Sequence, residues 1–232
     1  SENCAVGSNA LTANTTGNHN TAVGHACLDA NTTGSDNTAV GNGALTTNVS
    51  GANNSAFGVD ALRVNLAADN AAFGHYALKA NTTGTKNTAV GKGALTTNST
   101  PANNTAIGYN AMNLNTTGAN NTALGSFAME NNTTGTRNLA IGYAAYDASD
   151  TEDDNMAIGH NAMTANTAGG TGNLAIGNYA LEDLTSGDFN LGVGFNALLQ
   201  NTTGARNCAI GKNAMEVNTT GQYNVALGFY AM

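Results

Sequence analysis

Hydrophobic and polar positions recur along the chain with a period of 17 residues. The clearest copy is 104–120, with the sequence NTAIGYNAMNLNTTGAN. When the repeat is numbered from the Asn before T-A-[VIL]-G, position 1 falls at residues 3, 20, 37, 54, 70, 87, 104, 121, 138, 155, 173, 190, 207 and 224. The chain therefore holds 13 full repeats and a partial one. A fixed period of this size is typical of a solenoid, in which each coil stacks on the previous one.

Two glycine positions divide each repeat and predict its corners. Position 5 is Gly in all fourteen repeats, and position 15 is Gly in ten of thirteen, with Ala68, Pro101 and Glu152 as the exceptions. An invariant Gly indicates positive φ or close backbone approach. Between these corners, positions 2–4 and 9–13 are predicted to be short extended segments. The pattern therefore predicts an all-β fold, a parallel β-solenoid (β-roll) of 17-residue coils.

The alternation of side chains in an extended segment assigns faces to these positions. Position 9 is large and apolar, as at Leu28 and Met112, so it is expected to point inward together with positions 11 and 13. Position 10 carries residues such as Lys79 and Glu130 and is expected to face water. Position 4 is Val, Ile, Leu or Phe throughout, and it too is expected to point inward.

Position 3 is Ala in every repeat except for Gly192, on the face of the strand opposite position 4. Restriction to such small residues predicts a close-packed outer surface, which a neighbouring copy of the chain would cover. We therefore infer a homo-oligomer, with a homotrimer as the favoured form. The alternative is that Ala is needed only for a tight bend within the chain. The candidate interface residues are Ala22, Ala39, Ala56, Ala89, Ala106, Ala123, Ala140, Ala157 and Ala175.

Asn occupies position 1 in all fourteen repeats and position 12 in eleven of thirteen. Columns of identical amides can hydrogen-bond from coil to coil, so both positions are predicted to be structural ladders. Many of these residues also match Asn-x-Ser/Thr, the acceptor sequence for N-glycosylation. We interpret most of these matches as by-products of the repeat.

Composition limits the classes of protein to which the chain can belong. Charged residues make up 9%, the formal net charge is −8, and Trp is absent. No basic stripe is present to bind phosphates, so a nucleic-acid partner is not expected. No apolar run reaches the length of a membrane span, so membrane insertion is not expected. Cys4, Cys27 and Cys208 stand where Thr or Ala is usual, and small-residue substitution is favoured over a disulfide.

The repeat shows no arrangement of residues that predicts an active site, a metal site or a cofactor site. The histidines are too far apart along the stack to share a metal, and the carboxylates form no acid–base pair. The acidic run 147–154 has clustered oxygens that Ca²⁺ could use, but a solvated turn is the simpler interpretation. We therefore expect the protein not to be an enzyme.

Aromatic residues gather at positions 6 and 7 and would form a ridge along a stack of coils. Such a ridge predicts either a glycan-binding edge, on which sugar rings stack, or a contact between neighbouring chains. Thr at positions 13 and 14 suggests a third hypothesis, ice binding, although only one Thr column is expected to point outward. The candidate ligand-binding residues of the ridge are Tyr76, Tyr109, Phe127, Tyr143, Tyr179, Phe195, Phe229 and Tyr230.

The phrase N-T-A-[VI]-G resembles the S-V-A-I-G phrase of the YadA-like heads of trimeric autotransporter adhesins. The longer phrase N-T-A-V-G…A-L…N-T-T-G is similar to arrays in phage tail-fibre-like and bacterial surface proteins. The resemblance covers the whole chain and implies a left-handed parallel β-roll with three chains per fibre. It also implies an extracellular, cell-surface or virion location and a role in adhesion or reach.

These observations together predict a structural or adhesive fibre protein without catalysis. It would serve as the shaft or head of a surface adhesin or tail fibre, or as a filament subunit. Residues 1–232 are expected to form one solenoid domain without separate caps. The expected partner is the chain itself, as a homotrimer or a head-to-tail filament, with a cell-surface glycan or receptor as a further candidate. A fragment of a longer fibre is the alternative to head-to-tail stacking.

Overall fold

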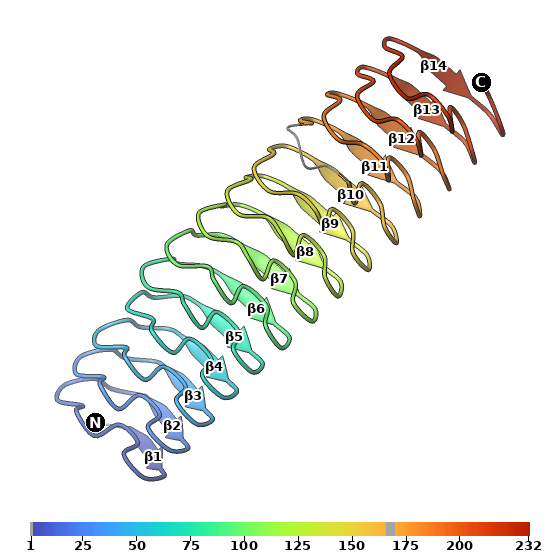
Figure 1. Cartoon of the computed structure of the whole chain (residues 1–232). Helices are drawn as coiled ribbons and strands as arrows, with labels where there is room; N and C mark the ends of the chain where they lie inside the picture. The colour runs from blue at the N-terminus through green and yellow to red at the C-terminus, as the bar shows by residue number, and fades with distance from the viewer. Residues whose placement is uncertain (1, 166–169) are drawn as a thin grey trace. The chain divides into compact units, whose positions relative to one another are not determined.

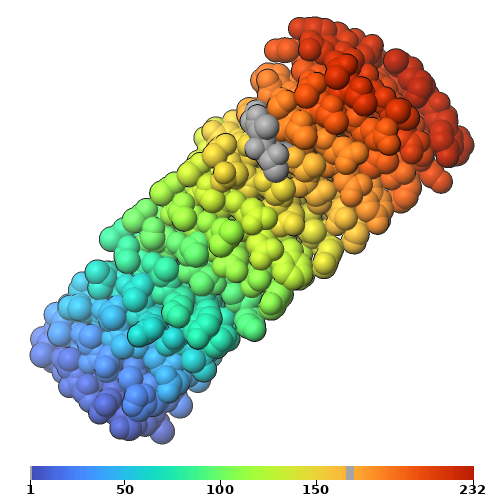
Figure 2. All heavy atoms as spheres, in the orientation of Figure 1, coloured from blue at the N-terminus to red at the C-terminus, as the bar shows by residue number. Residues whose placement is uncertain are grey.

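The computed structural model describes residues 2–165 and 170–232. The chain is an all-β parallel β-solenoid of about 13 turns, with coils of about 17 residues, as the repeat predicts. The residues group into two compact units, Ser1–Thr117 and Gly118–Met232. In each unit, every coil contributes one short strand and returns through turns and irregular backbone (Figure 1). Figure 2 shows that consecutive coils within a unit occupy consecutive bands of the surface.

Each strand covers positions 2–4 of a coil, as predicted, and strands of neighbouring coils pair in parallel. The register joins like positions, so Ala22 lies opposite Ala39 and Leu174 opposite Leu191. The first unit contains β1 (Cys4–Val6), β2 (Thr21–Val23), β3 (Thr38–Val40), β4 (Ser55–Phe57), β5 (Ala71–Phe73), β6 (Thr88–Val90) and β7 (Thr105–Ile107). The second unit contains β8 (Thr122–Leu124), β9 (Leu139–Ile141), β10 (Met156–Ile158), β11 (Leu174–Ile176), β12 (Leu191–Val193), β13 (Cys208–Ile210) and β14 (Val225–Leu227).

The glycine at position 5 makes the predicted corner for both of the expected reasons. Its φ lies between +131° and +146° in every coil, a region that favours glycine. A Cβ added at Gly91 would lie 2.3 Å from the carbonyl oxygen of Gly108 in the next coil. The two reasons act together, so no other residue fits this corner without moving the backbone.

The glycine at position 15 is required by close approach and not by a positive φ. A Cβ at Gly34 would lie 2.4 Å from Oδ1 of Asn31 and also 2.4 Å from the carbonyl oxygen of Gly51. In the coil that is one residue short, the amide of Asn54 donates to the carbonyl of Ala67 at 2.8 Å. Ala67 therefore takes the place of position 15 there, and the assignment of Ala68 to this corner is wrong.

The prediction of a second extended segment at positions 9–13 is wrong. Positions 6–11 form turns, and the residues at positions 7, 9 and 17 adopt a left-handed backbone conformation. Leu28 at position 9 has φ +49°, and Asp36 at position 17 has φ +59°. Alternation of faces does not hold through such a turn. Position 9 is nevertheless buried as predicted, with Leu28 and Met112 fully inaccessible to solvent. Positions 11 and 13, in contrast, lie at or near the surface.

The two faces of the strand are the reverse of the prediction. The alanines of position 3 point into the core, whereas position 4 points outward: Ile107 is 38% and Leu124 is 44% exposed. The predicted interface is therefore wrong, because these alanines are covered by their own chain. The residues concerned, all fully buried, are Ala22, Ala39, Ala56, Ala89, Ala106, Ala123, Ala140, Ala157 and Ala175.

The width of the coil explains why position 3 must be small. At Gly192, the one exception, an added Cβ would lie 3.2 Å from the carbonyl oxygen of Ala197 and 3.3 Å from Cγ of Leu181. The strand thus packs almost directly on the turn that carries positions 8 and 9. Each coil has room inside for a methyl group at position 3 and one large residue at position 9, and a second large residue at position 4 has to point outward.

Candidate functional site

The amides of position 1 form a continuous ladder along the core of each unit, as predicted. Nδ2 of Asn190 donates to the carbonyl of Gly204 at 2.8 Å and to Oδ1 of Asn173 at 3.1 Å. Oδ1 of Asn190 in turn accepts from the backbone nitrogen of Asn207 at 3.0 Å. These buried side chains therefore satisfy a backbone carbonyl of their own coil and a backbone nitrogen of the next coil, which is a structural role.

The amides of position 12 form a second ladder beside the first. Nδ2 of Asn31 donates to Oδ1 of Asn14 and to the carbonyl of Gly34, each at 3.0 Å. Asn14 and Asn218, near the two ends, are half-buried. The fully buried members of this column are Asn31, Asn48, Asn65, Asn81, Asn98, Asn115, Asn132 and Asn201. In the folded chain, the nitrogen that glycosylation would modify lies in the core. These matches to Asn-x-Ser/Thr are therefore not accessible acceptors once the coil has formed.

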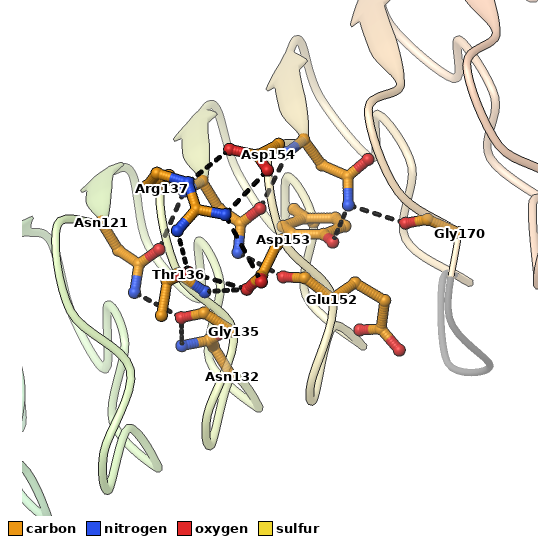
Figure 3. Close-up of polar contacts among 12 residues, drawn as sticks. Asn121, Asn132, Gly135, Thr136, Arg137, Glu152, Asp153, Asp154 and Gly170 are labelled. Carbon is orange, nitrogen blue, oxygen red and sulfur yellow. Dashed lines mark hydrogen bonds and ion pairs between the residues drawn. The ribbon is translucent and has the colours of Figure 1, made fainter.

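The acidic run 147–154 lies in coil 9 (residues 138–154) and pairs with coil 8 (residues 121–137), and Figure 3 shows these contacts. Arg137 donates to both carboxylate oxygens of Asp154, at 2.6 and 2.8 Å. The backbone nitrogen and hydroxyl of Thr136 donate to Oδ1 of Asp153, at 2.7 and 2.8 Å. Hydrogen bonding by Arg137 lowers the pKa of Asp154. Protein donors thus already occupy these oxygens of Asp153 and Asp154.

Two substitutions in coil 9 alter the amide ladder together. Position 12 is Ser149, which is shorter than Asn, and position 15 is Glu152, which has a Cβ where Gly is usual. The carboxylate of Glu152 is buried and accepts from the backbone nitrogens of Asp150 and Thr151, at 2.9 and 3.1 Å. The shorter serine leaves room for this Cβ beside the corner.

Tyr146 takes over part of the ladder in the same coil. It occupies position 9, where Leu or Met is usual, and it is the largest fully buried side chain. Its hydroxyl accepts from Nδ2 of Asn155 at 2.6 Å. That amide also donates to the carbonyl of Gly170 at 2.7 Å. A longer core residue with a polar tip therefore replaces the oxygen that an asparagine at position 12 would supply.

No group of three or more His, Cys, Asp or Glu that could hold a metal ion is present in residues 2–165 and 170–232. The three cysteines are free thiols, as the small-residue interpretation requires. Cys27 fills an alanine position in the core, and burial raises the pKa of its thiol.

Asp147 is the residue whose protonation should affect stability most directly. Oδ1 is buried without a hydrogen-bond partner, and burial together with the neighbouring Glu130 raises the pKa to about 6. The folded state therefore binds a proton more tightly than the unfolded state, and stability should fall as pH rises through about 6. After allowance for partial exposure, we expect a loss of about 1 kcal/mol.

Thermal unfolding between about pH 4.5 and about pH 7.5 should show this loss, and Asp147→Asn should remove it. The exposed Asp69 provides a matched control, because its carboxylate accepts from the neutral amide of Asn53 and Asp69→Asn should leave the pH dependence of the parent protein unchanged. Equal pH dependence of the parent and Asp147→Asn would contradict the assignment.

In the first unit the predicted aromatic ridge has two members, Tyr76 and Tyr109, which lie two coils apart. Tyr76 stacks on His75 of its own coil, with ring centroids 3.7 Å apart. Nζ of Lys79 lies over the Tyr76 ring, 4.0 Å from its centroid. Tyr109 lies beside Lys92, whose Nζ is 5.8 Å from the ring centroid. A lysine thus lies over or beside each of these two tyrosines.

In the second unit the ridge forms a ladder of rings over five consecutive coils. Phe127, Tyr143, His160, Tyr179 and Phe195 follow one another with centroid distances of 5.8, 5.2, 5.3 and 5.8 Å. Tyr143 and His160 are nearly parallel, so each covers a face of the other. The prediction omitted His160, because the ridge was assembled from Phe and Tyr alone. Glycan binding on this ladder stays a prediction.

A lysine extends the row of rings toward the C-terminal end of the second unit. Nζ of Lys212 lies 5.7 Å from the ring centroids of both Phe195 and Phe229. Phe229 also packs edge-to-face on Tyr230, with centroids 4.5 Å apart. Such distances are within the range of cation–π attraction. Lysine is thus part of this row, and a sequence search for aromatic residues does not detect it.

A second ring–cation–ring row lies at position 17. The guanidinium of Arg206 is 5.6 Å from the ring centroids of both Phe189 and Tyr223, one coil away on either side. Position 17 also carries the contact between Arg137 and Asp154, so its side chains interact from coil to coil. Sequence analysis missed this column because its residue types vary from coil to coil.

The Thr columns at positions 13 and 14 both lie at the surface, and not on opposite faces as expected. Thr15 and Thr16 are both exposed. The hydroxyl of Thr15 donates to the carbonyl of Thr32 at 2.9 Å, and the same bond recurs between Thr202 and Thr219. These hydroxyls therefore tie coils together as well as facing solvent. Ice binding stays a prediction.

Positions 2 and 4 of the strands point outward and form a surface, although the sequence pattern predicts that position 4 points inward. In the second unit we call it the outer sheet face, and it consists of positions 2 and 4 of β8–β14. Position 2 changes from Thr to larger apolar residues along this face. Its members are Thr122, Leu124, Leu139, Ile141, Met156, Ile158, Leu174, Ile176, Leu191, Val193, Cys208, Ile210, Val225 and Leu227.

Comparison with known proteins gives no family model that matches the chain, and no matching curated protein or solved structure. Within the part of the chain that the structure describes, no helix is long and apolar enough to cross a membrane.

Proposed function

We propose that this chain is a structural or adhesive fibre protein that works by its repetitive shape and by association with copies of itself, without catalysis. The observation that carries the proposal is the pair of amide ladders. Asn side chains at positions 1 and 12 bond each coil to the next, as Asn190 and Asn31 illustrate. The most invariant polar groups of the repeat thus serve to stack coils.

An architecture of this kind suits a fibre, because a coil contacts only its neighbours and length increases by adding repeats. The chain would form a shaft or head of a surface adhesin or tail fibre, or a filament subunit. Its location would be extracellular, at a cell surface or on a virion. Its first partner would be a further copy of the chain, as a homotrimer or a filament, and a surface glycan or receptor would be bound by the assembled fibre.

The mass of the protein in solution tests this proposal. Static light scattering of the purified full chain over a range of concentrations should give a mass at least twice the 23.2 kDa of one chain. A trimer would give a single closed species, whereas a filament would give a mass that grows with concentration. A mass of one chain at every concentration would contradict the proposal.

A further inference from the structure

We infer that the outer sheet face of the second unit is the surface through which one copy of this chain docks on another. This inference rests on the proposed function, since it names the residues by which copies associate. It replaces the position-3 alanines, which their own coils bury, with the residues on the opposite side of the same strands.

The first argument is the chemistry of this face. Neither position 2 nor position 4 of β8–β14 carries a charged residue, although the chain has a formal net charge of −8. Met156 and Ile176 are each 36% exposed, and Ile210 is 38% exposed. Single exposed apolar residues are normal on a protein surface, but a continuous uncharged apolar patch marks a site of interaction.

The second argument is the regularity and size of the face. The paired strands are in register, so Leu174 lies opposite Leu191 and Ile176 opposite Val193. The outward side chains therefore form two straight rows with a spacing of about 4.8 Å. Seven strands of three residues give an area of roughly 300 Å², which is the scale of functional apolar patches on single proteins.

The third argument identifies the occupant. A partner that covers these rows must present apolar side chains at the spacing of the coils and bring no charge into the contact. A second copy of this face meets both conditions, because its rows have the same spacing and carry no charge. Sheets pack face to face through interdigitated side chains in this way, and no desolvated charge has to be compensated.

The first unit offers a built-in comparison. The corresponding face there has smaller and more polar residues at position 2, such as Thr21, Thr38 and Thr88. Substitution of these residues by Leu and Met in the second unit increases the apolar area that association can remove from water. The docking surface is therefore assigned to the second unit.

Charge placed on the face provides the first test, in the full chain. The variant Ile158→Lys/Ile176→Lys should fold normally, because the lysine stem can lie on the sheet while the ammonium group stays in water. Between two copies these groups would be buried without partners. We expect the concentration of half-association in light scattering to rise at least about tenfold. The matched variant Val40→Lys/Val90→Lys in the first unit should change it by less than about threefold.

Cross-linking provides the second test and does not depend on weakening the assembly. In a background with Cys4→Ser, Cys27→Ala and Cys208→Val, single cysteines are introduced at position 2. Leu139→Cys, Met156→Cys, Leu174→Cys and Leu191→Cys are each treated with a short bismaleimide, and at least one should give a covalent dimer. Thr203→Cys, at an exposed turn, should give none.

The outcomes separate the two proposals. A parent protein that stays a single chain overturns the proposed function and this inference with it. A parent that associates, with both lysine variants unchanged and no cross-linked dimer, overturns the inference alone. Equal weakening by the two lysine variants would also overturn it, because the surface would then not be confined to the second unit. Circular dichroism of each variant, matched to that of the parent, confirms that the fold is retained.

Discussion

Gly91→Ala should destabilise the protein by about 3 kcal/mol or more, because it combines two penalties at a position with no freedom to adjust. The φ of Gly91 is +131°, in a region that residues with a Cβ rarely adopt. The new Cβ would also lie 2.3 Å from the carbonyl oxygen and 2.7 Å from the carbonyl carbon of Gly108. Relief of this clash requires separation of the two coils, which breaks the hydrogen bonds between their strands. Urea unfolding and limited proteolysis would measure the loss.

A glycine two residues away provides the control. Gly93 stands at position 7 with φ +76°, and Asn110 occupies the same position of the next coil with φ +52°. A Cβ at Gly93 would meet only Oδ1 of Asn110, the end of a side chain that can move. Gly93→Asn should therefore change the free energy of unfolding by less than about 1 kcal/mol. A similar loss for both variants would contradict the corner argument.

The sequence predicts the strands and corners well because backbone geometry determines them. An invariant glycine needs no tertiary information to be recognised as a corner, and Gly91 and its counterparts are confirmed. The prediction that position 9 lies in the core is also confirmed, as at Leu28 and Met112. The left-handed backbone at Leu28 is a different matter. Leu gives no local signal for such a conformation, so the segment was predicted to be extended.

The sequence pattern predicts the wrong faces for the strand, because a large hydrophobic residue is not always a buried one. In a wide core the larger residue of position 4 would point inward, but here the strand packs directly on a turn. Gly192 shows how little room remains, since even a Cβ there would touch Ala197 and Leu181. The width of a coil depends on how far apart its two sides lie. The turn geometry determines that distance, and a pattern of residue types does not reveal it.

Interactions between coils could be predicted where one residue type repeats and not where types alternate. The amide columns repeat, so their ladders were predicted. The contact of Arg206 with Phe189 and Tyr223 joins different residue types, and the same is true of Lys212 between Phe195 and Phe229. Once the coil is known to be 17 residues long, such pairs follow from residues 17 apart. A search of each position for complementary partners in the next coil would have found them.

Asn190→Ala should destabilise the protein by about 3 to 5 kcal/mol, because one side chain serves groups in two neighbouring coils. Its amide nitrogen donates to Gly204 and Asn173, and its oxygen accepts from the backbone and side-chain nitrogens of Asn207. Alanine would leave the backbone nitrogen of Asn207 buried without its acceptor, and the carbonyl of Gly204 would keep only the hydrogen bond from Asn201. The orphaned nitrogen costs about 1 to 3 kcal/mol, and each of the other lost hydrogen bonds costs about 1 kcal/mol. Urea unfolding of the full chain measures the change.

Two further variants separate the hydrogen bonds from the loss of volume. Asn42→Ala, at an exposed turn, should change stability by less than about 0.5 kcal/mol. Asn190→Asp keeps the shape of the side chain but places a carboxylate against the oxygens of Gly204 and Asn173. Protonation restores one donor, so the folded state should raise the pKa of this aspartate, and the variant should be more stable at acidic pH than at neutral pH. A loss for Asn190→Asp that did not change with pH would contradict the role of the amide as a donor in the ladder.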